Sequence, residues 1–203
     1  MKPKFTYLAI FFSIFISACS SKYLQPLGYV AVQPYAKPFQ KKITTPLTIV
    51  LMEDVKDSLV MDGGGIKMMK VRDFRRSVKD GLNSTFAKNF QSVNFTETNP
   101  EKGFVLVIYR IRPFWKVGGS STSAVLAGNV AVPVTSNNSA AAFQFESSLF
   151  LDNKKIQVAD SQTYSDELTG GSRPHLIFED GLRIMCESIN KMIFTDEVLE
   201  KIN

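Results

Sequence analysis

The sequence predicts an α+β domain of two layers, with a mainly antiparallel or mixed β-sheet and two amphipathic helices on one face. Three observations support this prediction. Short apolar runs of strand length recur along the chain. Two longer segments place apolar residues at every third or fourth position, the period of a helix. Runs of strands punctuated by two such helices indicate two layers around one core.

The first 18 residues have the organisation of a secretory signal peptide. Lys2 and Lys4 precede an apolar run of about 14 residues that ends at Ala18. A membrane-spanning helix needs roughly 20 apolar residues, so this run is too short to be one. We therefore assign residues 1–18 to a signal peptide.

The signal ends in Ile16-Ser17-Ala18-Cys19, which resembles the lipobox of bacterial lipoproteins. The resemblance implies cleavage between Ala18 and Cys19 and acyl chains on Cys19. The alternative is an ordinary signal peptide with a cysteine at this position by chance. Ser20, where an aspartate would favour retention in the inner membrane, implies an outer-membrane protein. The covalent lipid is the only prosthetic group that we expect.

The mature chain is long enough for one domain and only mildly basic. Removal of residues 1–18 leaves 185 of the 203 residues, and the loss of two lysines lowers the net charge from +5 to +3. That charge is too small to indicate a nucleic-acid partner. With Cys19 acylated, Cys186 is the remaining thiol, so no intramolecular disulfide is expected. Its place in a helical pattern predicts a small buried hydrophobic residue.

Residues 19–45 are predicted to form a lipidated tether or strap. Pro26, Pro34 and Pro38 interrupt any helix, yet the segment is too apolar for a pure linker. Fully extended, residues 20–45 would span roughly 85 Å. We expect a partly extended strap that packs on the domain or on a partner. The folded domain is predicted to cover residues 46–203.

The domain is expected to begin with a buried strand and a hairpin. Residues 47–52 form a short apolar run typical of a buried strand. Residues 59–61 and 66–71 flank Asp62-Gly63-Gly64-Gly65, a strong hairpin signal because glycine tolerates positive φ. A phosphate-binding loop is excluded because no Gly-Lys-Ser/Thr follows these glycines.

The clearest helical pattern covers residues 72–89. Apolar residues recur every four positions along one stripe: Phe74, Val78, Leu82, Phe86 and Phe90. Gly81 within this helix suggests a close packing contact. Beside the stripe, Arg72, Arg75, Arg76 and Lys79 share a second face. That face is either solvated and partly neutralised by nearby acids, or a contact for an anionic partner such as lipid headgroups or an acidic protein surface.

Two further strands are expected before the middle of the chain. Residues 91–96 form a short one, and residues 104–115 form the longest strand. The continuous apolar run from Phe104 to Tyr109 indicates that both faces are covered. Pro113 predicts a sheet edge or a bulge near the end of this strand.

Residues 118–142 are predicted to be a long insertion, since the chain carries no charge from Gly118 to Gln144. Three interpretations are open. The insertion could be a flexible loop, or an apolar loop that docks on a partner or a membrane surface. It could also be a membrane-inserting β-hairpin that turns at Gly128-Asn129. The candidate docking residues are Val125, Leu126, Val130 and Val132.

The C-terminal part is predicted to contain a hairpin and two helices. Residues 142–151 alternate apolar and polar side chains, and residues 156–164 return after a turn at 152–155. Residues 176–194 form the second amphipathic helix. A short helix over residues 196–202 ends the domain.

The sequence carries no motif for catalysis, and we expect a protein that is not an enzyme. His175 is the only histidine, so any Ser-His-Asp or Cys-His device would have to include it. One histidine without a cysteine cluster is a poor zinc site, and no metal is expected. The carboxylates are scattered, although a hydrolase that uses only carboxylates is an open alternative.

The lipobox, the order of elements and the Phe74–Phe90 stripe before a long apolar strand together resemble small periplasmic lipoproteins of Gram-negative bacteria. These include the YajG type and the ring-forming lipoproteins of exopolysaccharide and curli secretion. The resemblance implies a lipid-anchored protein of the outer membrane that faces the periplasm. It also implies a non-catalytic role in an envelope complex, with a protein partner or as a homo-oligomer. The rival hypotheses are a carrier for lipid or polysaccharide and, third, a hydrolase.

Overall fold

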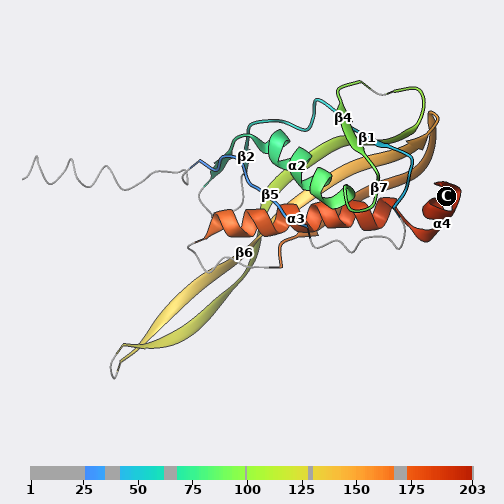
Figure 1. Cartoon of the computed structure of the whole chain (residues 1–203). Helices are drawn as coiled ribbons and strands as arrows, with labels where there is room; N and C mark the ends of the chain where they lie inside the picture. Colours follow the sequence, from blue (N-terminus) through green and yellow to red (C-terminus); the bar gives the residue numbers. More distant parts are fainter. Residues whose placement is uncertain are drawn as a thin grey trace, which may run out of the picture.

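The computed structural model describes residues 26–34, 42–61, 68–98, 100–127, 130–166 and 173–202, with side chains except in 117–138 and at position 202. Seven strands and three helices lie in these ranges (Figure 1). Their bounds are β1 Leu47–Leu51, β2 Leu59–Met61, β3 Met69–Val71, α2 Phe74–Phe86, β4 Val93–Thr96, β5 Phe104–Ala127, β6 Val130–Leu151, β7 Lys154–Tyr164, α3 Pro174–Ile193 and α4 Asp196–Ile202.

The main sheet has five strands in the order β4-β1-β5-β6-β7. β1 runs parallel to both β4 and β5, whereas β5, β6 and β7 form an antiparallel meander. β2 and β3 form a separate antiparallel pair. Helices α2 and α3 pack on one face of the sheet (Figure 1). The predicted α+β fold with a mixed sheet and two helices on one face is confirmed.

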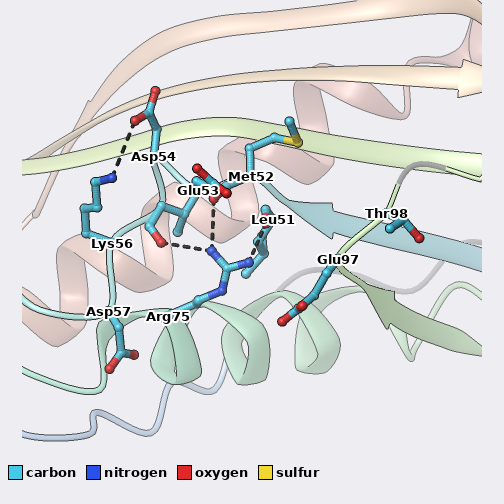
Figure 2. Close-up of a pocket in the computed structure, with 10 residues that line it drawn as sticks. Leu51, Met52, Glu53, Asp54, Lys56, Asp57, Arg75, Glu97 and Thr98 are labelled. Atoms are coloured by element: carbon cyan, nitrogen blue, oxygen red, sulfur yellow. Dashed lines mark hydrogen bonds and ion pairs between the residues drawn. The ribbon is translucent and has the colours of Figure 1, made fainter.

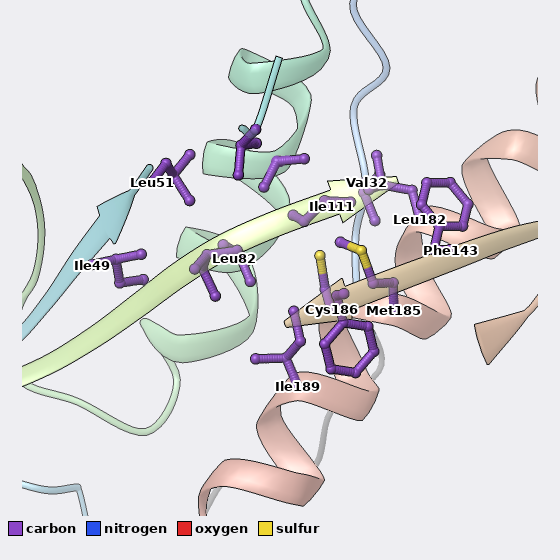
Figure 3. Close-up of a cluster of buried hydrophobic side chains, with 14 of the residues drawn as sticks. Val32, Ile49, Leu51, Leu82, Ile111, Phe143, Leu182, Met185, Cys186 and Ile189 are labelled. Atoms are coloured by element: carbon purple, nitrogen blue, oxygen red, sulfur yellow. The ribbon is translucent and has the colours of Figure 1, made fainter. Parts of the chain in front are cut away.

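The main core lies between this sheet face and the two helices. The predicted stripe of α2 is fully buried, and Phe74 and Phe178 each contact Phe143 of β6, with ring centroids 6.5 and 5.3 Å apart. Figure 3 shows side chains from β1, β5, α2 and α3 meeting in this cluster. Both amphipathic stripes are therefore confirmed as the faces that the helices bury.

The start of β5 is buried on both faces, as its continuous apolar run predicts. Phe104 and Leu106 belong to the main core, whereas Val105 and Val107 join Val50 in a second cluster on the opposite face. β5 lies between β1 and β6 along this stretch. A central strand that is covered on both sides has no solvent-facing positions, so every residue can be apolar.

Glycine and cysteine allow the two helices to approach closely. A Cβ built on Gly81 would lie 3.0 Å from the Sγ atom of Cys186, which is fully buried. Burial raises the pKa of the Cys186 thiol to about 12. The predicted close contact at Gly81 and the predicted burial of Cys186 are both confirmed.

Helix α2 is shorter than its pattern predicts. It begins at Phe74 rather than Arg72, because Asp73 has a left-handed conformation with φ of 53°. It ends at Phe86, and the Ala87 N–H donates to the carbonyl of Asn83 as the chain turns away. Apolar periodicity continues past both ends, so it does not mark where the helical backbone stops.

Of the three interpretations of residues 118–142, the two that expect a loop are wrong, whereas a β-hairpin is confirmed and its insertion into a membrane stays a prediction. β5 continues without interruption to Ala127, and β6 begins at Val130, so this segment consists of two paired strands. Pairing resumes after an irregularity between Val117 and Ser120 and then continues row by row to Ala127 and Val130. Absence of charge and abundance of Gly and Ser suggested a loop, but the valines and threonines among them favour strands.

The remaining hairpins follow their turn signals. Asp152 and Asn153 have φ of 46° and 63°, which suits the two-residue turn between β6 and β7. β2 and β3 pair as predicted, although their turn at 62–67 lies outside the described residues. Pro113 lies on β5 beyond Ile108, where pairing with β1 ends, so its predicted edge position is confirmed.

The described part of the predicted strap packs on the domain. Leu27 forms a parallel bridge with Val71, and Ile43 forms another with Phe90. Val30 and Val32 are 7% and 4% exposed and belong to the main core. No helix in the described ranges is long and apolar enough to span a membrane.

Candidate functional site

The predicted basic face of α2 divides into side chains with different roles. Arg75 is half-buried, and its Nη1 atom donates to the carbonyls of Met52 and Val55 at 2.9 and 3.0 Å. Its Nη2 atom donates to the carbonyl of Leu51 (Figure 2). These carbonyls lie where β1 ends and the next loop begins. Arg75 therefore holds this loop, and its guanidinium is engaged by main-chain carbonyls.

The other members of this face lie closer to solvent. Arg72 and Arg76 are exposed, and Lys79 is half-buried. The guanidinium of Arg76 lies 4.5 Å from the ring centroid of Tyr29, a cation–π contact with the strap. A hydrogen bond with Asp80 raises the pKa of Tyr29, a residue that is 40% exposed. Arg72 and Arg76 thus remain candidates for an anionic partner.

The strap attaches to the edge of β3 beside these arginines. The Leu27 N–H donates to the Lys70 carbonyl, and the Arg72 N–H donates to the Leu27 carbonyl, both at 2.8 Å. Alternation along β3 buries Met69 and Val71 and leaves Lys70 exposed, with Arg72 next on the same side. Val60, opposite Lys70 on β2, is 49% exposed. We call Val60, Lys70 and Arg72 the outer β2–β3 face.

The paired strands over residues 117–127 and 130–139 form an extension that we call the arm. Figure 1 shows it projecting well beyond the helices and the rest of the sheet. β1 pairs with β5 only as far as Ile108, and β7 pairs with β6 only as far as Ala142. Among the described residues, therefore, no strand pairs with either outer edge of the arm.

The predicted docking residues occupy the distal part of the arm. Val125 pairs with Val132, and Val130 pairs with Ala127 two rows away in register. These positions fall on one face of the ribbon, while Leu126, paired with Ala131, falls on the other. The structure therefore brings three of the four predicted residues to a common face. The predicted cleavage and lipidation residues, Ala18 and Cys19, lie outside the described residues.

A pocket of about 830 Å³ lies at the loop that Arg75 holds. Charged side chains dominate its lining, including Glu53, Asp54, Asp57 and Glu97 (Figure 2). Such a lining does not suit a lipid chain, which needs apolar walls. No group of three or more metal-ligating side chains occurs in the part of the chain that the structure describes. His175 is exposed on the first turn of α3.

The chain matches no family model and no curated protein. Its fold is similar to a crystal structure from Xanthomonas campestris described by the family model DUF330. The TM-score is 0.50 at 12% sequence identity, over 82% of this chain and 92% of that one. A minor lipoprotein from Acinetobacter baumannii is more distant, with a TM-score of 0.42 and 9% identity over 72% of this chain and 90% of that one.

The sequence patterns did not single out Val60 and Lys70 or relate them to Tyr29 of the strap. A three-residue strand is too short for alternation to reveal which face is solvated. The one available signal was the apolar spacing of Leu27, Val30 and Val32, which indicated that the strap packs on something. Its position against β3 depends on a contact between segments more than 40 residues apart.

Proposed function

We propose that this protein is a lipid-anchored, non-catalytic interaction or assembly component of a bacterial envelope complex. The observation that supports this function best is the arm. It extends away from the core with both outer edges unpaired by any described strand. An element of this kind adds little to the core of its own domain and offers two strand edges to another chain.

The physical chemistry of the arm favours strand addition. A two-stranded hairpin alone is at best marginally stable in water. Unpaired N–H and C=O groups along a strand edge are a template for another strand, and proteins usually protect such edges with charges. The arm has no lysine, arginine, aspartate or glutamate between Gly118 and Ser139. A partner strand, from another protein or a second copy, would satisfy these backbone groups.

The membrane anchor in this proposal is supported by the sequence. The lipobox-like Ile16 to Cys19 would place acyl chains on the first residue of the mature chain. Several acyl chains hold a protein firmly, whereas one alone binds only marginally. Ser20 favours the outer membrane, with the domain in the periplasm. A Cys19→Ala variant is expected to move from the membrane pellet to the soluble fraction after cell lysis and centrifugation.

Removal of the arm tests the interaction role. In the test variant, Asn-Gly replaces residues 118–138 and joins Val117 to Ser139, which pair in the native register. The native chain is expected to cross-link into a larger species in intact membranes, and the variant to run as a monomer. The matched control replaces the turn Asp152-Asn153 by Asn-Gly and leaves the arm intact.

The stability of the arm variant shows whether a loss of cross-linking comes from a lost contact or from an unfolded domain. Trp115, 3% exposed near the base of the arm, reports folding through its fluorescence. Because the main core ends near Trp115 and Ala141, we expect the midpoint of urea unfolding to change little. Identical cross-linked species in the native chain, the arm variant and the control would refute an assembly role for the arm.

A further inference from the structure

We propose that the outer β2–β3 face, together with Arg76, rests on the anionic lipid surface into which Cys19 is anchored. This inference depends on the lipid anchor proposed above and specifies how the domain is oriented on it. Two independent features of the described residues support it: the point at which the strap leaves the domain, and the charge of the surface around that point.

The attachment of Leu27 shortens the reach of the tether. Leu27 is held on both sides by main-chain hydrogen bonds to β3. Eight residue steps separate it from Cys19, a distance of at most roughly 28 Å when fully extended. A domain of about 160 residues has a radius of gyration of roughly 15 Å and hence a diameter of roughly 40 Å. The end that carries Leu27 must therefore stay near the membrane.

The surface at that end has the chemistry of a membrane interface. Lys70, Arg72 and Arg76 are exposed beside an exposed valine, Val60, and the partly exposed ring of Tyr29. Basic side chains attract anionic headgroups, and aromatic rings such as that of tyrosine favour the headgroup level. The exposed carboxylates of Asp57 and Asp73 lie close in sequence and offset part of this charge.

Further basic residues extend this surface toward the base of the arm. Val60 shares a cleft of about 360 Å³ with Arg110 and Arg112 of β5, and Asp54 and Lys56 also line it. The Nη2 atom of Arg110 lies 3.6 Å from the Oε2 atom of Glu146, so these two side chains form an ion pair, whereas Arg112 is exposed. The outer β2–β3 face is thus continuous with cationic side chains of the main sheet.

The opposite end of the domain has the opposite character. Helix α4 lies there, far from β2 (Figure 1), and carries Asp196, Glu197 and Glu200 against one lysine, Lys201. An anionic surface would repel this helix. Charge and tether length therefore favour the same orientation, with α4 directed away from the membrane.

Fluorescence quenching from the lipid surface tests the orientation. Full-length lipidated protein carries a fluorophore on Val60→Cys or on Lys154→Cys, at the distant turn between β6 and β7. Cys186 resists labelling because its thiol is buried and its pKa is raised to about 12. The vesicles contain phosphatidylethanolamine and phosphatidylglycerol with a headgroup quencher. We expect quenching at position 60 to exceed that at position 154 by about threefold or more.

Charge reversal identifies the contribution of the basic residues. In the double variant Lys70→Glu with Arg72→Glu, quenching at position 60 and quenching at position 154 are expected to lie within about twofold of each other. The matched control, Lys102→Glu with Lys191→Glu, makes the same change in net charge at exposed positions elsewhere and is expected to preserve the difference. Vesicles of zwitterionic lipid alone should reduce the difference in the native protein.

Sedimentation with the vesicles separates the two proposals. If the native protein sediments and Cys19→Ala does not, the anchor holds, and equal quenching at positions 60 and 154 then refutes the orientation alone. Stronger quenching at position 154 refutes it as well. If the native protein fails to sediment, the lipid anchor is refuted and the orientation is refuted with it.

Discussion

Arg75 and Arg76 are neighbours on one helix, yet their surroundings give them different roles. Arg75 donates hydrogen bonds to three main-chain carbonyls at the end of β1, and Arg76 lies over Tyr29 at the surface. A guanidinium has a rigid fork of five donors, so it can bind several carbonyls at once. At the scale of single residues, local acceptors rather than helical periodicity decide which cation can meet a partner.

Replacement of Arg75 by methionine should lower the free energy of unfolding by about 2 kcal/mol or more, because three carbonyls lose a charged donor. Arg75→Lys should recover only part of this loss, since an ammonium cannot reproduce the fork. Arg76→Met is the control and should cost less than about 1 kcal/mol. Urea denaturation followed by Trp115 fluorescence measures all three variants. Equal losses for Arg75→Met and Arg76→Met would contradict the structural role of Arg75.

Cys186 should make stability depend on alkaline pH. Its pKa is raised from 9.0 to about 12, first because burial disfavours the thiolate and second because Glu187 is nearby. The folded protein therefore holds the proton more tightly than the unfolded chain. This difference stabilises the folded protein fully below about pH 9. The stabilisation is lost as pH rises toward 12, by at most about 1.4 kcal/mol per pH unit.

The unfolding free energy measured by urea titration from pH 8 to pH 10.5 tests this dependence. The native protein should lose more stability over this range than Cys186→Ala, in which the titrating group is absent. Groups that titrate in both proteins cancel in the comparison. Parallel pH profiles for the two proteins would show that the Cys186 thiol does not contribute.

At the scale of elements, close approach between a helix and the sheet depends on small residues. Gly181 of α3 faces Ala141 and Phe143 of β6. A Cβ built there would lie 2.7 Å from the Cε2 atom of Phe143 and 3.0 Å from the Ala141 carbonyl oxygen. Part of this contact is main chain, which cannot move aside as a flexible side chain can.

Gly181→Ala should therefore destabilise the domain by about 1–3 kcal/mol, even though alanine has the higher helix propensity. Gly81→Ala is the matched control, because its nearest neighbour is the Cys186 side chain at 3.0 Å and the next is Val32 at 3.7 Å. It should cost less than Gly181→Ala, because its tight contact is with one side-chain atom and not with main chain. Thermal unfolding followed by circular dichroism compares the two. A Gly181 variant as stable as the Gly81 variant would place α3 farther from β6.

Across the molecule, the strap and the arm are the two elements through which we propose that the protein makes its contacts. The strap contributes Val30 and Val32 to the core and leaves a short tether before Leu27. The arm carries the edges of β5 and β6 away from the core. We infer a domain held near the membrane with an element extended toward a partner.

The strap should behave as part of the cooperative unit. Val32→Ser replaces a valine that is only 4% exposed. The lost apolar burial should lower the free energy of unfolding by about 2 kcal/mol. The adjacent Gln33→Ser, at an exposed position, is the control and should be neutral within about 0.5 kcal/mol. Both are measured by urea denaturation. A neutral Val32→Ser would mean that the strap detaches without unfolding the domain.

Local patterns in the amino-acid sequence are enough to predict the fold class, both amphipathic helices, the turn between β6 and β7 and the burial of Cys186. Each of these depends on a period or a turn residue that acts over a few positions. The folded structure was needed to choose the β-hairpin among the three interpretations of residues 118–142, and to show that Arg75 binds carbonyls and that Leu27 is fixed to β3. These features depend on contacts between segments far apart in the chain, whose free energy local patterns do not encode.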